Sequence, residues 1–93
     1  MSKVSSLKRL SRNHSIWIAA NPLRQWRTSR DKKIPQAMVG NCIGRSTQAV
    51  RDYEAGSYRP DAEAILSLAT LIGITEKTLR RKWNQWLTTK PNF

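Results

Sequence analysis

The chain has 93 residues and a formal net charge of +11, with 17 lysines and arginines against six acids. This length suits one domain with a small core, and the charge favours a polyanionic partner, either nucleic acid or an anionic membrane surface. No apolar run reaches the roughly 18 residues that a membrane-spanning helix needs, and the single cysteine, Cys42, excludes an internal disulfide and a zinc site built from several thiolates.

The first residues are rich in serine, lysine and arginine. We interpret Met1 to Ser15 as a mobile arm, or as a helix that becomes ordered on binding. A cluster of three cations in it is expected either to contact DNA, in the minor groove or along the phosphates, or to be only solvated: Lys8, Arg9 and Arg12. The apolar segment 16–20 is shorter than the roughly 7 to 15 residues of a secretory signal core. We therefore expect a basic arm over residues 1–20, a domain over 21–79, and a helical extension and tail over 80–93.

The next three helices are marked by capping residues. Asn21 can cap a helix that starts at Pro22 and ends in the charged stretch 30–33. A second helix is expected from about Pro35 to Ile43. A third is expected from a Ser46 cap to about Glu54, with Gly56 just beyond its end. No stretch alternates as a strand does, so the sequence predicts an all-α protein.

Two further helices complete the chain. Asp61 caps the first, which Gly73 closes and whose apolar residues recur at helical spacing: Ala62, Ile65, Leu66, Ala69 and Ile72. Thr75 caps the last helix, on which one apolar stripe contains Leu79, Trp83, Trp86 and Leu87. We expect this stripe to pack on segment 16–20, on the helix after Asn21 or on a second copy of the protein, rather than to stack on bases.

Residues 36–56 have the layout of two short helices joined by a sharp turn. Gly40 is small enough for close backbone approach, and Gly44 can take the positive φ that a tight turn demands. The apolar positions that would hold the two helices together are Val39, Ile43, Val50 and Tyr53. This is the arrangement of a helix-turn-helix, whose second helix can enter the DNA major groove.

The charge is concentrated at the two ends. Residues 1–33 carry a net charge of +8, residues 34–76 of −2 and residues 77–93 of +5. We therefore expect the ends to provide salt-sensitive attraction to phosphates, and the centre, if it reads DNA, to use polar side chains.

From the first predicted helix to the last, the chain resembles the Cro and phage-repressor type helix-turn-helix family, also called the XRE family. The resemblance covers roughly Leu23 to Leu79. It is carried by Trp26, Arg27, Gln36, Gly40, Ile43, Gly44, Ser46, Val50, Tyr53, Glu54, Gly56, Pro60, Leu66, Leu68, Ala69 and Gly73. Pro35 departs from the family, which commonly has a serine or threonine cap there.

The resemblance implies a compact five-helix, lambda-repressor-like domain that binds double-stranded DNA as a homodimer and regulates transcription. It implies a phosphate contact for Gln36, and backbone contacts for Tyr58 and Arg59. It also implies that Arg27 pairs with Glu54 to brace the motif. The exposed groove face would comprise Thr47, Gln48, Arg51 and Asp52, with Arg45 and Ser46 at its start.

Side-chain chemistry assigns roles within this face. The amide of Gln48 matches adenine, because it can bind both N6 and N7 in the major groove. Thr47 could meet a thymine methyl or a phosphate, whereas Ser46 is expected to use its hydroxyl for capping. Arg51 could bind guanine or a phosphate. Asp52 is expected to pair within the protein, with Arg51 or Arg45, unless it accepts from cytosine.

These expectations favour a sequence-specific DNA-binding regulator, a repressor of phage, plasmid or mobile-element type, located in the cytoplasm with the nucleoid. An alternative is a helix-turn-helix adaptor or antitoxin-like protein that binds another protein through its arm or its C-terminal helix. An enzyme is disfavoured, because six acids, one histidine and one cysteine offer no catalytic set. We expect no cofactor, no metal and no membrane attachment.

Overall fold

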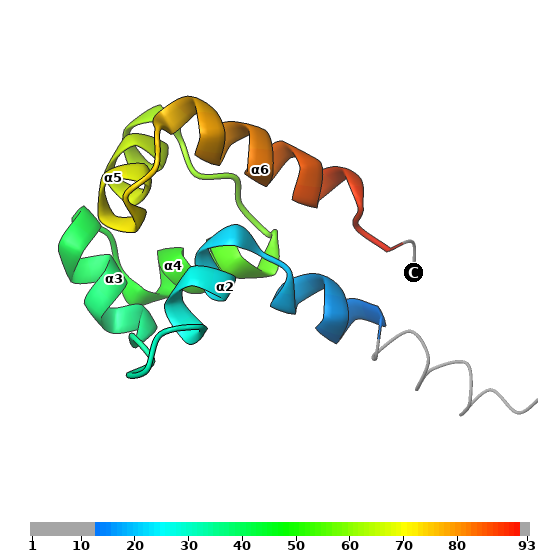
Figure 1. Ribbon diagram of the computed structural model, residues 1–93, viewed down its shortest axis with the longest axis horizontal. Helices are drawn as coiled ribbons and strands as arrows, with labels where there is room; N and C mark the ends of the chain where they lie inside the picture. The colour runs from blue at the N-terminus through cyan, green and yellow to red at the C-terminus, as the bar shows by residue number, and fades with distance from the viewer. Residues whose placement is uncertain (1–12, 92–93) are drawn as a thin grey trace, which may run out of the picture.

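The fold is built entirely from helices in the part of the chain that the structure describes. The computed structural model describes residues 13–91, and a first helical segment spans 13–19. It is followed by α2 (Pro22–Thr28), α3 (Gln36–Ile43), α4 (Thr47–Ala55), α5 (Ala62–Ile72) and α6 (Glu76–Thr88), which surround one core (Figure 1). The all-α prediction is confirmed, with segment 13–19 added to the five helices that the sequence predicted. None of the described helices is both long and apolar enough to cross a lipid bilayer.

Four helices begin where the sequence places a capping side chain. Asn21 accepts hydrogen bonds from the backbone N–H groups of Leu23 and Arg24 at the start of α2. Ser46, Asp61 and Thr75 each accept one from the residue three positions later, at the start of α4, α5 and α6. These local bonds satisfy N–H groups that have no partner within the helix, which explains why the helix starts could be predicted.

One helix boundary differs from the prediction by more than a residue. α2 ends at Thr28, before the charged stretch 30–33. The Thr28 hydroxyl donates to the Arg24 carbonyl at 2.8 Å and the Ser29 hydroxyl to the Trp26 carbonyl at 3.2 Å. The Ser29 bond gives the Trp26 carbonyl, one of the last four of the helix, a partner without a further helical turn. α3 begins at Gln36, and Pro35 provides no side-chain cap.

The core lies between α2, α3, α4, α5 and α6. Its fully buried side chains are Leu23, Val39, Val50, Leu68, Leu79 and Trp83. The apolar stripe of α6 therefore faces the interior of the monomer. It packs on α2 and α5 and, through Trp86, on Trp17 of segment 16–20. Leu87, at the end of the stripe, is half-buried and packs against the same core.

Trp17 joins the two ends of the described chain. Its ring stacks on that of Trp86, with centroids 4.1 Å apart and an interplanar angle of 5°. The Trp17 Nε1–H donates to the Trp86 carbonyl at 2.8 Å, and the Trp86 Nε1–H donates to the Trp17 carbonyl at 2.7 Å. Of the basic arm expected over residues 1–20, the part beginning at residue 13 thus forms a helix anchored by a buried tryptophan. Lys8, Arg9 and Arg12 lie outside the described residues.

Candidate nucleic-acid interface

The turn between α3 and α4 has the glycine geometry that the sequence predicts. Gly44 ends α3 with φ at 71° and ψ at 32°, and its N–H donates to the Gly40 carbonyl. A Cβ atom added at Gly40 would lie 2.6 Å from the Arg45 carbonyl oxygen and 3.3 Å from the Ser46 carbonyl carbon. The absence of a side chain at Gly40 therefore lets the backbone of the turn rest directly on α3, which fixes the angle between the two helices.

α4 has a buried face and an exposed face. Val50, Tyr53 and Glu54 point inward and are at most 7% exposed. Gln48 and Arg51 are exposed, and Thr47 and Asp52 are half-buried. The side chains predicted to read DNA are therefore accessible on the described monomer.

The exposed face of α4 is ordered by its own hydrogen bonds. Arg51 donates from Nη1 to Gln48 Oε1 at 3.2 Å, and Gln48 donates from Nε2 to Asp52 Oδ1 at 3.0 Å. Asp52 does have the intramolecular role expected of it, but its partner is Gln48 rather than Arg51 or Arg45. The chain of bonds holds the Gln48 amide along the helix, with a carboxylate at one end and a guanidinium at the other.

A buried ion pair fixes the inner side of α4 against α2. Arg27 and Glu54 form two parallel hydrogen bonds of 2.8 Å, from Nε to Oε2 and from Nη2 to Oε1. Arg27 also donates to the Ile34 carbonyl at 3.1 Å, and Arg24 approaches Glu54 to 3.9 Å. Bidentate geometry of this kind is the strong form of the arginine–carboxylate contact. The bracing pair implied by the family resemblance is present.

Gln36 belongs to the same cluster. Its Nε2 donates to Glu54 Oε1 at 3.2 Å, and the residue is half-buried. Its side-chain amide is therefore engaged within the protein, and the phosphate contact expected of Gln36 stays a prediction. Pro35 provides no side-chain cap for the first backbone N–H groups of α3. Such groups favour an anion at a helix start.

Two arginines next to the α4 face are held by contacts that the sequence did not indicate. Arg45 pairs with Asp61 at 3.1 Å and lies 3.9 Å from Glu63, both at the start of α5. Arg59 donates to Asn84 on α6. Ser46 is used as expected, because its hydroxyl accepts from the Ala49 N–H at 3.1 Å. Tyr58, between these elements, is 67% exposed.

Asp61 and Asn84 are partners for these arginines that the sequence does not indicate. The sequence marks Asp61 only as a helix cap, and it marks Asn84 in no way. Contacts between helices leave no periodic signal in the chain, so no pattern could have identified them.

Comparison of the chain with protein-family models, with curated proteins and with solved structures finds no match.

Proposed function

We propose that the protein is a helix-turn-helix regulator that binds double-stranded DNA sequence-specifically, and that α4 reads the major groove. The observation that carries this proposal is the two-sided character of α4. One side is fixed to α2 by the buried Arg27–Glu54 pair, while the other presents Gln48 and Arg51 to solvent. A rigidly held helix with an exposed amide and guanidinium suits recognition of base edges.

The surroundings of α4 support the same function. The two helices are joined by the glycine turn that a helix-turn-helix needs, and the net charge of +11 favours a polyanion. The tryptophans of α6 are buried within the monomer, which favours the regulator over an adaptor that would bind a partner protein through this apolar stripe. We further propose that the protein acts as a homodimer whose two α4 helices lie about 34 Å apart, in successive major grooves.

The decisive experiment is selection of bound sites from a random duplex library, repeated with two glutamine variants. Gln48→Ala should relax the preference at one or two base pairs, a loss of about 1 to 3 kcal/mol in discrimination. Gln25→Ala, at an exposed position on α2, is the matched control and should select the original consensus. An inverted repeat with half-sites about ten base pairs apart is expected for a dimer.

Selection of the same consensus by Gln48→Ala and the unaltered protein would contradict the assignment of α4. Failure of the unaltered protein to enrich any sequence would contradict the proposed function as a whole.

A further inference from the structure

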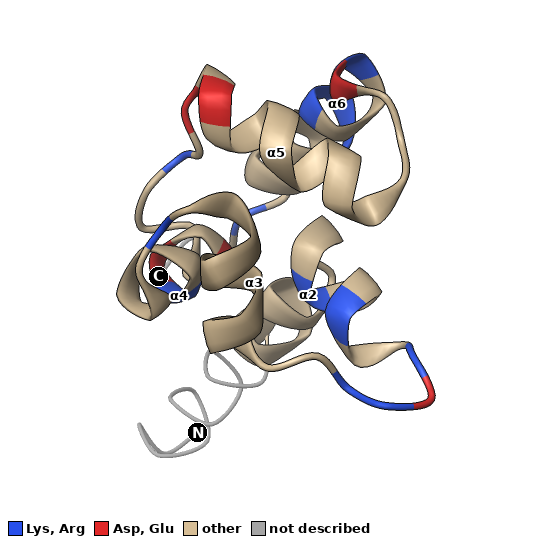
Figure 2. Cartoon of the chain, turned by 90° about the vertical axis from the view of Figure 1, so that its left-hand side faces the viewer, with Lys and Arg blue, Asp and Glu red and all other residues tan. Residues whose placement is uncertain are grey.

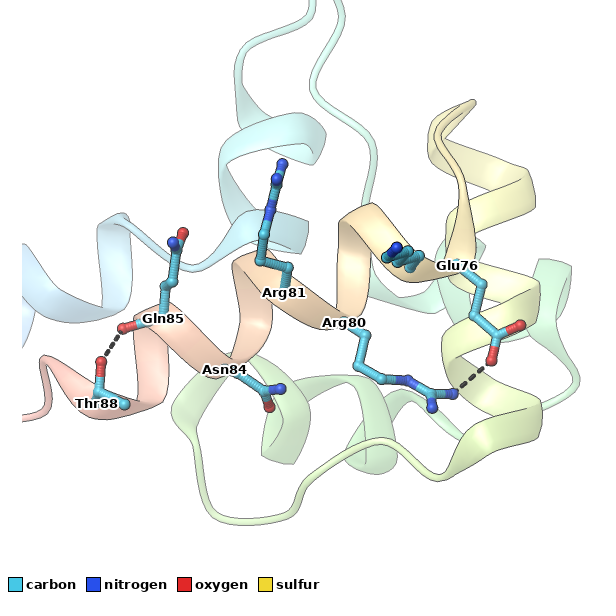
Figure 3. A pocket seen from close by; sticks show the side chains of 7 residues that line it. Glu76, Arg80, Arg81, Asn84, Gln85 and Thr88 are labelled. Carbon is cyan, nitrogen blue, oxygen red and sulfur yellow. Dashed lines mark hydrogen bonds and ion pairs between the residues drawn. The ribbon is translucent and has the colours of Figure 1, made fainter.

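The outer face of α6 is a polar and basic surface that the proposed reading of DNA by α4 does not use. Its side chains line a shallow depression, shown in Figure 3, and all but the half-buried Glu76 are exposed: Glu76, Lys77, Arg80, Arg81, Asn84, Gln85 and Thr88. Arg81 and Gln85 point to one side of the helix, while Arg80 and Asn84 point to the other. We refer to this set as the α6 outer face.

Two cations of the α6 outer face are not neutralised within the described chain. Arg80 is paired with Glu76, whereas among residues 13–91 neither Lys77 nor Arg81 forms an ion pair. Lys77 also lies in the first turn of α6, where the helix dipole disfavours a positive charge. A cation kept at a locally unfavourable position is typical of a binding surface.

The composition of this face favours phosphates over a protein partner. The exposed large apolar residues of the described chain are Ile16, Met38, Tyr58 and Leu66, none of which lies on α6. Protein interfaces obtain most of their affinity from buried apolar or aromatic anchors, which are lacking here. Lysine, arginine, asparagine, glutamine and threonine are instead the side chains that contact nucleic-acid backbones. A second copy of the chain docked symmetrically would oppose like charges.

The α6 outer face and the exposed face of α4 belong to different parts of the molecule. α6 packs on α5 and α2 through its buried stripe, so that its outer face points away from the core. Figures 1 and 2, which differ by a 90° turn, both show α6 along the upper edge and α4 in the lower half. Arg59, in the loop after α4, donates to Asn84, so the side of the α6 outer face that carries Arg80 and Asn84 borders the α4 region. Arg81 and Gln85 point to the opposite side of α6, and we assign the second duplex to that side (Figure 3).

We infer that the α6 outer face is a second, sequence-indifferent site for the phosphate backbone of double-stranded DNA, so that one molecule can hold two duplex segments. This inference rests on the proposed function, because α6 can hold a second duplex segment only if α4 holds a first one. Lys77 and Arg81 supply the uncompensated charge, and Gln85 supplies hydrogen-bonding groups beside them.

A bridging assay tests this inference. A duplex containing the selected consensus is fixed to beads, the full-length protein is added, and the recovery of a labelled duplex of unrelated sequence is measured. Lys77→Gln/Arg81→Gln should lower the recovery about tenfold or more, since two phosphate contacts are removed. Binding to the fixed duplex should change by no more than about twofold, because α4 is untouched. Lys32→Gln/Lys33→Gln, at two exposed positions in the loop before α3, is the control with the same loss of charge and should still bridge.

The outcomes separate this inference from the proposed function. Equal loss of bridging in both double variants would overturn the inference, because total charge alone would then explain bridging. Failure of the unaltered protein to recover the labelled duplex would also overturn the inference. Bridging by Lys77→Gln/Arg81→Gln at the level of the unaltered protein would overturn it too, because the two α4 helices of a dimer would then hold the two duplexes. The absence of any selected consensus would instead refute the proposed function. In that case a phosphate site on α6 would still be supported if Lys77→Gln/Arg81→Gln lost non-specific duplex binding and Lys32→Gln/Lys33→Gln kept it.

Discussion

Trp17 and Trp86 exchange hydrogen bonds, so that each indole N–H donates to the main-chain carbonyl of the other residue. The two residues are 69 positions apart in the chain, and their rings are stacked. This contact ties the helical segment 13–19 to the end of α6. The two apolar rings are buried against each other, and both of their indole N–H groups still have a hydrogen-bond acceptor.

Replacing either tryptophan of this pair should destabilise the protein. Trp17→Phe and Trp86→Phe each remove one buried hydrogen bond and reduce the stacked ring area, at a cost of about 1 to 3 kcal/mol. The two carbonyls keep their bonds from Ala20 and Thr89. Urea denaturation measures the free energy of unfolding. The double variant should lose less than the sum of the single losses, because the residues are in direct contact. Trp26→Phe, at a half-buried position outside the pair, is the control. Strictly additive losses would show that the two residues are not coupled.

The buried ion pair predicts a large effect of removing one partner. Glu54→Ala should destabilise the protein by about 3 to 5 kcal/mol, because the Arg27 guanidinium would remain buried without its carboxylate. Glu76→Ala removes the carboxylate of the exposed Arg80 pair and should cost less than about 1 kcal/mol. Denaturation midpoints of the two variants compare these costs directly. A loss at Glu54 no larger than that at Glu76 would be incompatible with a bracing role.

The turn between α3 and α4 predicts different effects for its two glycines. Gly40→Ala should disrupt the turn, because the new Cβ would lie 2.6 Å from the Arg45 carbonyl oxygen. Gly44→Ala meets no atom within 4 Å and should cost only the strain of a positive φ, about 1 kcal/mol. Thermal unfolding should therefore show the larger decrease in Tm for Gly40→Ala. The reverse order would indicate that α3 can move away from the turn.

Asp52 allows its charge to be separated from its hydrogen bond. Asp52→Asn keeps an acceptor for Gln48 and removes a negative charge near the expected DNA, so affinity should rise for all sequences by about 0.5 to 1 kcal/mol. Asp52→Ala removes the acceptor as well, and should reduce the preference at the base pairs that Gln48 reads. Binding titrations on the consensus and on single-base variants distinguish these effects. Identical selectivity of the two variants would mean that Asp52 does not position Gln48.

Local signals along the chain are enough to predict the helices and most of their ends. Ser46, Asp61 and Thr75 each bond to a backbone N–H three residues later, and Gly44 adopts a conformation that its own lack of a side chain permits. These interactions are local, so the order of residues is enough to predict them. The division of α4 into a buried and an exposed side follows from helical periodicity in the same way.

The tertiary structure alone decided which distant residues meet. Gln36 donates to Glu54, Arg59 to Asn84, and Trp86 pairs with Trp17 within the monomer. Each of these contacts depends on how two helices cross, and the crossing is set by the packing of the whole core. A polar side chain at the surface of a helix has several possible partners, and only the assembled helices bring one of them within hydrogen-bonding distance.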